Sequence, residues 1–417
     1  MRFAEVVGHS GIKSKFNELI AAKRLPHAMM LLGNEGSGGL AMALAIAQNV
    51  VCEKRNNNTS NDGGMFGESL PKVELTDACG VCAACGQAEK LIHPDIYFTF
   101  PVFPKKRKKD DDDEMNINDF DDKQPKKSTS VALSSYFIDE WRKAVLNNPY
   151  QNYIEWLQSI EAENKQGNIS VHECHEIVRT VKMRPYSAPY KIRIIWLAEC
   201  LKETGNTLLK VIEEPPDDTL FIFVVEQAEQ MLGTILSRTQ ITKLPPIADE
   251  DLARFLAQNY SLENAQANRI AKISEGNLNR AMLYALGGAN EYETSLQEWL
   301  SASVRLMGNY ASEASVKMQE LSDKFAQLGR ENQKAFIQYG LWFLREVLQL
   351  NQGLTSEKLD AKEQEYAARM NRMLNPEKIY QLQKTLSNFH YHIERNANPK
   401  ISFYAVSFQF YRIFTSK

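Results

Sequence analysis

The sequence predicts an α/β protein: a largely parallel sheet covered by helices, followed by an all-helical region. Helical periodicity over Gly39–Val51 and Glu203–Glu214 alternates with apolar runs in the first part of the chain. This alternation is typical of β-α-β units, whose strands run parallel beneath their helices. The three runs typical of buried strands are His27–Leu32, Tyr190–Glu199 and Thr219–Glu226.

Further helices are expected before and after these strands. Ile12–Lys23 carries apolar residues at helical spacing, and a later helix opens with Ser170 and Glu173 at capping-box spacing. After about residue 246 the strand signals fade, and long helices are predicted, for instance over Gln333–Leu350. The aromatic-rich tail after Asn398 fits a helix or a strand, because its periodicity does not separate the two.

The composition is that of a soluble globular protein with two or three domains. The chain has 417 residues, 43% of them hydrophobic and 24% charged, and its formal net charge is −3. A net charge this small excludes a positive electrostatic potential over the whole protein surface. Contact with nucleic acid would therefore need a local patch of basic residues or a partner protein. The sequence has no apolar run of about 18 residues and no basic-plus-apolar leader, which predicts a cytoplasmic protein without a membrane span.

Two segments interrupt the predicted α/β region. Residues 53–78 are rich in Asn and Gly, and residues 104–130 hold adjoining basic and acidic blocks. Both compositions are typical of disordered surface insertions. Because the acidic block offsets the basic one, we interpret 104–130 as a solvated loop rather than a nucleic-acid patch.

The glycine-rich turn "GNEGSGGL" follows the first predicted strand and resembles a phosphate-binding loop. Gly33 and Gly38 have the required spacing, but Gly39 and Leu40 stand where that loop has a lysine and a hydroxyl residue. Backbone N–H groups at Gly33, Gly36, Gly38 and Gly39 could still attract a phosphate to the helix N-terminus. The alternative is a plain strand-to-helix turn, and the sequence leaves open whether ATP or ADP binds there.

Four of the six cysteines form a predicted metal site. Cys79, Cys82 and Cys85 have C-x2-C-x2-C spacing, and Cys52 can complete a tetrahedral set. A structural zinc is favoured because nothing nearby indicates redox chemistry, and an iron–sulfur cluster is the alternative. His93 could substitute as a ligand, although a turn before a strand suits it better.

Ordered motifs over about residues 5–245 resemble the bacterial clamp-loader family of AAA+ proteins. Within that family the chain is most similar to the delta-prime subunits, because gamma/tau subunits are expected to keep the lysine and a pair of acids, whereas this chain offers only Glu199. The insertions and residues 131–168 depart from the common pattern. The motifs that carry the resemblance are the opening segment through "LLGNEGSGG", the four-cysteine module, "HPD", "ISVHECHEIVR", "NTLLKVIEEPP" and "TILSRTQ".

The resemblance implies an AAA+ α/β domain over 1–245 with a zinc module at 52–88, a helical lid over 246–291 and a helical collar over 292–417. It implies a subunit of the DNA polymerase III holoenzyme in a pentameric ring with gamma/tau-like and delta-like subunits. Such a ring loads a sliding clamp onto primed DNA, which the neighbours mostly hold.

The resemblance also assigns a role to Arg238, which in isolation would be a solvated surface arginine. In the family this arginine acts in trans as an arginine finger on a neighbour's ATP. Here Thr239 replaces the usual cysteine beside it. The isolated chain is expected to lack ATPase activity, because its own phosphate loop lacks the lysine and the hydroxyl.

Two other functions stay open at this stage. One is an ATP-binding, gamma/tau-like ATPase or nucleotide switch with a non-standard loop, which tight, magnesium-dependent ATP binding would favour. The other is a zinc-dependent nucleic-acid-binding protein, which salt-sensitive DNA binding by residues 52–100 would favour.

Overall fold

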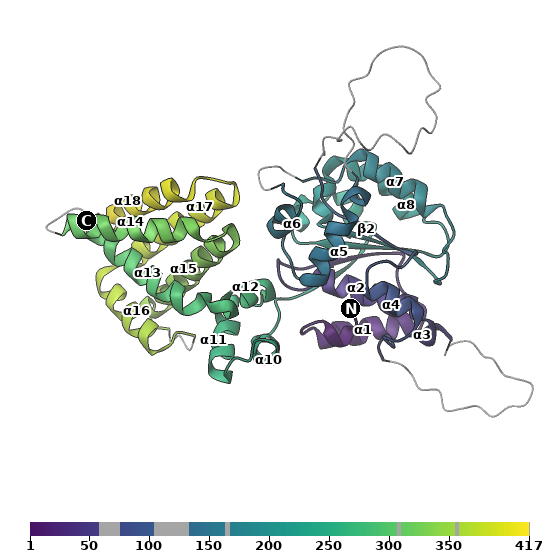
Figure 1. Ribbon diagram of the computed structural model, residues 1–417, viewed down its shortest axis with the longest axis horizontal. Coiled ribbons are helices and arrows are strands. Elements are labelled where there is room, and N and C mark those ends of the chain that lie inside the picture. The colour runs from purple at the N-terminus through teal and green to yellow at the C-terminus, as the bar shows by residue number, and fades with distance from the viewer. Residues whose placement is uncertain (58–75, 104–132, 163–166, 307–309, 355–357, 417) are drawn as a thin grey trace, which may run out of the picture. The chain divides into compact units, whose positions relative to one another are not determined.

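The computed structural model describes residues 1–57, 76–103, 133–162, 167–306, 310–354 and 358–416. The chain divides into two compact units, Met1–Pro246 and Ile247–Lys417 (Figure 1). Most of the predicted insertions, 53–78 and 104–130, lies outside the described residues, although Glu53–Asn57 forms a short helix. The finer division into a lid, 246–291, and a collar, 292–417, stays a prediction.

The first unit is built on a parallel five-stranded sheet, which confirms the predicted fold class. The strands are β1 (Ala28–Leu32), β2 (Ile96–Thr99), β3 (Lys191–Trp196), β4 (Thr219–Val225) and β5 (Gln240–Lys243). Their order is β2-β3-β4-β1-β5, and every pair is parallel. β1 lies between β4 and β5 and is not an edge strand. The turn that follows β1 therefore lies at the carboxyl ends of the strands, between the two neighbouring strands.

Helices cover both faces of this sheet (Figure 1). The helical elements are η1 (Phe3–Glu5), α1 (Ser10–Ala21), α2 (Gly39–Val51), α3 (Glu53–Asn57), α4 (Ala83–Glu89), η2 (Ser134–Phe137), α5 (Ile138–Asn147), α6 (Tyr153–Ser159), α7 (Val171–Val181), η3 (Ala198–Leu208), α8 (Leu209–Glu213), η4 (Ala228–Gln230) and α9 (Gly233–Leu236). α2 packs on β1, β3 and β4, whereas α7, η3, α8 and α9 pack on the opposite face.

The predicted helical stretch over 203–214 is helical in the structure, but its first half is a 3-10 helix and not an α-helix. A 3-10 segment, η3, runs to Leu208, and an α-helix follows only for the five residues of α8. Gly205 lowers the helix propensity of this stretch, and a Cβ there would lie 2.9 Å from Cδ1 of Ile235. The backbone at Gly205 thus packs tightly against α9, and this stretch forms a 3-10 helix instead of a regular α-helix.

Helix α7 shows how its cap and its core residues are fixed. Ser170 accepts a hydrogen bond from the Glu173 backbone N–H at 3.2 Å, as the capping signature predicts. The Glu173 carboxylate turns into the core, where it accepts from the Ser134 backbone N–H at 2.8 Å and from the Thr99 hydroxyl at 3.2 Å. Cys174 is fully buried among apolar side chains and is a small residue of the core.

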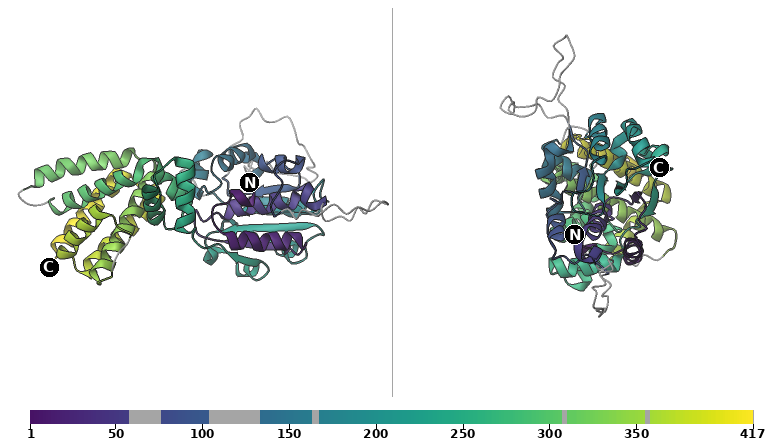
Figure 2. Two further views of the ribbon diagram at one scale, coloured as in Figure 1. Left: turned by 90° about the horizontal axis from the view of Figure 1, so that it is seen from below. Right: turned by 90° about the vertical axis from the view of Figure 1, so that its right-hand side faces the viewer.

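The described residues of the second unit are helical. Its elements are α10 (Asp249–Tyr260), α11 (Asn264–Ser274), α12 (Leu278–Leu283), the π-helical turn η5 (Tyr284–Gly288), α13 (Ala289–Val304), α14 (Ala311–Gln327), α15 (Arg330–Asn351), α16 (Ala361–Met373), α17 (Pro376–Glu394) and α18 (Pro399–Thr415). Long helices pack side by side, with α15 on α17 and α18 on α13, α14 and α17 (Figure 2). The aromatic-rich tail is therefore helix α18, capped by Asn398.

An aromatic core and a buried ion cluster hold this unit together. The Trp299 ring is fully buried, stacks on Phe403 with centroids 4.4 Å apart, and donates its indole N–H to Ser407 Oγ at 2.8 Å. In the same unit, the Arg269 guanidinium lies 2.8 to 3.1 Å from three carboxylates on α13, on α16 and just before α16. No described helix is both long enough and apolar enough to cross a membrane.

Candidate functional site

The glycine-rich turn joins β1 to α2 at the carboxyl edge of the sheet, where parallel α/β proteins bind ligands. Gly36 and Gly38 have φ values of 73° and 92°, which favour glycine. A Cβ on Gly39 would lie 2.9 Å from Cγ1 of Val224, so a lysine there would press on β4. Leu40, at the place of the missing hydroxyl, is 3% exposed and belongs to the core. The packing of the turn thus opposes the two side chains that phosphate chemistry requires.

Beside this turn lies a hollow of only about 20 Å³, room for roughly one water molecule. Gly33 is close to the backbone as well, because a Cβ on it would lie 2.9 Å from the carbonyl oxygen of Leu244. The predicted turn residues are therefore brought together, but around very little space. The residues that line the hollow include Gly33, Gly36, Gly38, Gly39, Tyr150 and Trp196.

The strands beside the turn do not end in a pair of metal-binding acids. Trp196 ends β3 and lines the hollow, and Val225 ends β4. Glu199, the acid that the sequence offers, accepts hydrogen bonds from the backbone N–H groups of Glu226 and Gln227 at 3.1 and 3.3 Å. Burial raises the pKa of its carboxyl group. Glu199 therefore connects the segment after β3 to the end of β4.

Arg238 follows α9 and precedes the edge strand β5. Its Nε donates to Oε2 of Glu213 at 3.1 Å, and its Nη1 donates to the carbonyl oxygen of Thr234 at 3.1 Å. The Arg238 side chain is 33% exposed and that of Glu213 is 58% exposed. An ion pair this exposed contributes about 0.2–1 kcal/mol, so a phosphate could compete for the guanidinium.

The four predicted cysteine ligands form one cluster, with all sulfur atoms within 4.8 Å of one another. Cys52 follows α2, Cys79 and Cys82 lie on the loop before α4, and Cys85 lies in α4. The sulfur atoms of Cys79 and Cys85 are 3.9 Å apart. That separation matches the edge of a tetrahedron with metal–sulfur bonds of about 2.3 Å, which is about 3.8 Å. The donor set fits one metal ion, whereas several iron atoms with sulfides would require more widely spread thiolates.

Backbone N–H groups support the cysteine cluster. Those of Cys79 and Cys85 lie 3.3 and 3.4 Å from the sulfur atoms of Cys52 and Cys82. Burial would raise the pKa of the Cys79 thiol, but hydrogen bonds, led by that from the Val81 backbone N–H, outweigh it and lower the pKa to about 6. Burial instead raises the pKa of the Cys52 and Cys85 thiols, so of these three cysteines only Cys79 favours the metal-binding thiolate near neutral pH.

His93 is separate from the cysteine cluster. It lies in the turn before β2, where its Nδ1 accepts a hydrogen bond from the Asp95 backbone N–H at 3.1 Å. The prediction that it serves a turn rather than a metal is consistent with this contact. Two other residues on the "HECH" segment, His172 and His175, are exposed on α7 and lie outside the described metal-binding groups.

Asp77 is a structural residue of the module that the sequence did not single out. Its carboxylate accepts hydrogen bonds from the backbone N–H groups of Phe3 and Ala4 at 3.1 and 2.9 Å and from Asn49 Nδ2 at 2.9 Å. Asp77 thus ties the cysteine loop to η1 and to α2. Its position inside the Asn- and Gly-rich insertion gave no sign of this role.

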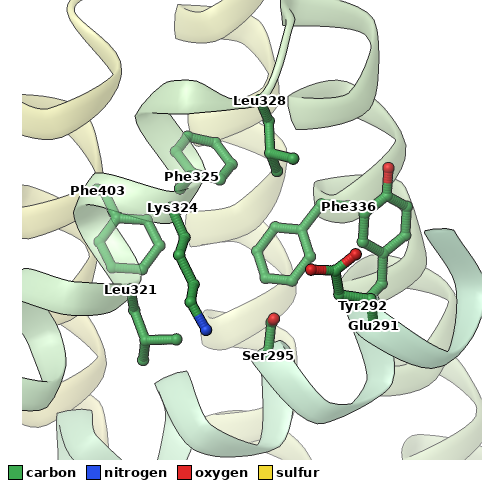
Figure 3. A pocket seen from close by; sticks show the side chains of 9 residues that line it. All are labelled: Glu291, Tyr292, Ser295, Leu321, Lys324, Phe325, Leu328, Phe336 and Phe403. Carbon is green, nitrogen blue, oxygen red and sulfur yellow. The ribbon is translucent and has the colours of Figure 1, made fainter. Parts of the chain in front are cut away.

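A second hollow, of about 40 Å³, lies among α13, α14, α15 and α18 of the helical unit. Figure 3 shows Phe325, Phe336 and Phe403 around it, with Lys324 and Glu291 beside them. A dry cavity that holds benzene has about 150 Å³. The hollow is therefore a gap in aromatic packing and not a cofactor site.

Sequence comparison now assigns the chain to a family. The family described as "DNA polymerase III, delta subunit" matches residues 8–248, which include the glycine-rich turn, the cysteine cluster and Arg238. The chain belongs to this family. The resemblance to bacterial clamp-loader subunits is thereby confirmed. The match ends two residues into the second unit, so it says little of the helices that follow.

Individual relatives are distant. The chain is 22% identical over 303 residues to subunit tau of DNA polymerase III from Bacillus subtilis, a match that covers 72% of this chain and 38% of that protein. It is 23% identical over 259 residues to subunit delta' from the same organism, which covers 61% of this chain and 54% of that protein. For subunit delta' from Escherichia coli, the identity is 22% over 149 residues, covering 35% and 44% of the two chains.

The chain thus spans about 38 to 54% of the length of these relatives. Such similar identities do not separate the delta' group from the gamma/tau group. The crystal structure of a gamma subunit-related protein from Thermotoga maritima aligns with 96% of this chain and 99% of its own, at 11% identity and a TM-score of 0.35. The fold described above rests on its own strand order and not on that alignment.

Proposed function

We propose that this chain is a non-hydrolysing clamp-loader subunit of the delta' type. In this proposal it joins gamma/tau-like and delta-like subunits of DNA polymerase III in a pentameric ring in the cytoplasm, and helps to load a sliding clamp onto primed DNA. The observation that carries the proposal is the glycine-rich turn. Gly39 packs on Val224 where a lysine would be needed, and Leu40 is buried where a hydroxyl would be needed.

Arg238 is the group that we propose acts on ATP, at the site of a neighbouring subunit. It lies next to the edge strand β5, and its contacts to Glu213 and Thr234 are partly exposed. Exchanging the Glu213 carboxylate for a γ-phosphate costs little, because an exposed ion pair is weak. An arginine that neutralises charge on the transferred phosphoryl group typically accounts for about 10³–10⁵ in rate.

The cysteine cluster is proposed to bind a structural zinc ion. The four sulfur atoms leave no ligand position open for a water molecule, which is the arrangement of structural rather than catalytic zinc. Zinc would hold the loop that carries Asp77, and with it the N-terminal segment that Asp77 binds. We expect it to contribute to folding and not to chemistry.

The test is the ATPase of a complex rebuilt with the organism's intact-loop ATPase subunit, clamp and primed DNA, comparing wild type with Arg238→Ala. Arg142 offers a matched control. Its side chain is 32% exposed, its Nη1 lies 3.1 Å from Oδ1 of Asp139, and its Nε donates to the Leu91 carbonyl at 3.1 Å. Arg142→Ala therefore removes the same kind of side chain and contacts within the same unit.

We expect Arg238→Ala to assemble normally and to lose most of the clamp- and DNA-stimulated ATPase of the site next to it, while Arg142→Ala retains the wild-type rate. Size-exclusion chromatography of each complex checks assembly. A fully assembled Arg238→Ala complex with wild-type ATPase would contradict the proposal. So would an equal loss in both variants.

A gamma/tau-like subunit or nucleotide switch is the second candidate. It is favoured by the match to tau, which covers more of this chain than the match to delta' does. Magnesium-dependent ATP binding by the isolated chain, measured by titration calorimetry, would support it over the delta' proposal.

A further inference from the structure

A tyrosine side chain lies against the glycine-rich turn, where a ligand would be cradled. Tyr150 lies between α5 and α6 and is 6% exposed. Its ring is so close to Gly38 that a Cβ on that glycine would lie 2.9 Å from the ring Cε1. Its hydroxyl accepts a hydrogen bond from the Val7 backbone N–H at 2.9 Å. The ring thus reaches from the turn to the N-terminal segment.

Two further contacts fasten the same three stretches of chain. The His9 Nε2 lies at hydrogen-bond distance, 2.7 Å, from the carbonyl oxygen of Ser37. The Asn152 Nδ2 donates to Oε1 of Glu35 at 3.4 Å. The N-terminal segment and residues 148–152 therefore hold the turn on both sides, with Tyr150 between them.

We propose that Tyr150 is a built-in occupant of the phosphate cradle, which excludes nucleotide and joins the turn to the N-terminal segment. This inference rests on the proposed function, since it explains how a subunit without its own ATP keeps the turn folded.

Physical chemistry favours the ring over an anion at this place. The N-terminus of α2 attracts negative charge through its free N–H groups. An entering phosphate, however, would have to expel a buried aromatic ring, break the Val7 hydrogen bond and bind without a lysine to neutralise it. Burial raises the pKa of the Tyr150 hydroxyl, so the occupant stays a neutral phenol. Removing the ring would enlarge the hollow of about 20 Å³ by the space of a phenol.

The experiment is amide hydrogen exchange of the isolated full-length chain, read at residues 33–40 and at Val7, with and without millimolar Mg·ATP or inorganic pyrophosphate. The variants are Tyr150→Phe, Tyr150→Leu and Tyr150→Ala. Tyr153→Phe is the control, because the Tyr153 hydroxyl bonds to Gly167 and not to the turn. Tyr150→Leu serves if the alanine variant does not fold, since it keeps part of the apolar volume.

We expect ATP and pyrophosphate to leave the exchange of wild-type residues 33–40 unchanged. Tyr150→Phe should speed exchange at Val7 alone, because it keeps the ring and loses the acceptor. Tyr150→Ala, or Tyr150→Leu, should speed exchange at residues 33–40 at least tenfold, and Tyr153→Phe should not.

Two results would overturn the inference: protection of the wild-type turn by ATP, or unchanged exchange at residues 33–40 in every Tyr150 variant. The second result would leave the proposed function intact, because the Arg238 assay is made on the complex and does not depend on Tyr150. Conversely, wild-type ATPase in the assembled Arg238→Ala complex, together with the expected exchange pattern, would contradict the proposed arginine finger. The inference that Tyr150 occupies the phosphate cradle would then still hold.

Discussion

Removing the proposed zinc ion from the cysteine cluster should loosen the N-terminal segment of the protein, although none of the proposed zinc ligands lies in that segment. Asp77 precedes the ligand Cys79 by two residues, and its carboxylate binds the backbone N–H groups of Phe3 and Ala4. Without the ion, the metal–sulfur bonds that would join Cys79 to Cys52 are lost. We therefore expect Asp77, two residues before Cys79, to leave its position.

The size of the effect follows from the hydrogen bonds at risk. Asp77 accepts from Phe3, Ala4 and Asn49 at 2.9 to 3.1 Å. A buried hydrogen bond to a charged acceptor contributes about 1.5–3 kcal/mol to stability. The three hydrogen bonds of Asp77 are partly exposed, so we take a contribution of about 1 kcal/mol for each. The sum of about 3 kcal/mol corresponds to exchange at these amides that is about 100-fold faster.

The assay is hydrogen exchange of the N-terminal peptide before and after chelation, with the released metal counted by a colorimetric chelator. We expect one zinc per chain and faster exchange at Phe3 and Ala4 as it leaves. Cys82→Ser should reproduce the effect without chelator, whereas Cys200→Ser, outside the cluster, should not. Complete release of metal with unchanged protection at these residues would refute the coupling through Asp77.

Three further predictions concern the rest of the fold. The double variant Gly39→Lys, Leu40→Thr should gain no ATPase activity, which a phosphate-release assay measures. It should lose about 2–5 kcal/mol of stability in urea unfolding, because the lysine presses on Val224 and the core loses a leucine. Burial alone would raise the pKa of the Asp95 carboxyl group, but hydrogen bonds from the backbone N–H groups of 186–188 outweigh burial and lower it. Ionised Asp95 therefore stabilises the folded protein above the unfolded-state pKa of about 4. This stabilisation is lost as the pH falls through the pKa of the folded state. Asp95→Asn should therefore flatten the acid limb of stability measured by urea unfolding between about pH 7 and pH 3. Trp299→Phe should cost about 1–3 kcal/mol in the same assay, through its lost indole hydrogen bond and volume.

The strands inside the sheet could be predicted from the sequence, and the edge strand β5 could not. β1, β3 and β4 lie inside the sheet, so their residues form continuous apolar runs. β5 consists of Gln240–Lys243 and pairs on one side only, so polar residues suffice and no apolar run marks it. Tertiary pairing, which local sequence does not encode, determines that this segment is a strand.

The residues of the candidate site also fall into two groups, those that the sequence predicts and those that it does not. The glycines and cysteines could be predicted because their spacing within a short segment already carries the chemistry. Tyr150, Glu213 and Asp77 could not, because each acts on a residue far along the chain: Val7, Arg238 and Phe3, respectively. A single tyrosine or acid carries no sign of such a contact until the fold brings the segments together.

One physical explanation covers both the retained glycines and the missing lysine of the turn. Gly33 packs on the carbonyl of Leu244, Gly38 combines a φ of 92° with the ring of Tyr150, and Gly39 packs on Val224. Each glycine is therefore required by the chain's own packing, whether or not a nucleotide binds. A lysine at position 39 would break this packing and, without ATP, leave a positive charge at the positive end of α2. The glycine pattern alone is therefore no evidence for ATP binding in this chain. In the proposed role, the subunit contributes its shape and Arg238 to its neighbours, which requires the glycines and not the lysine.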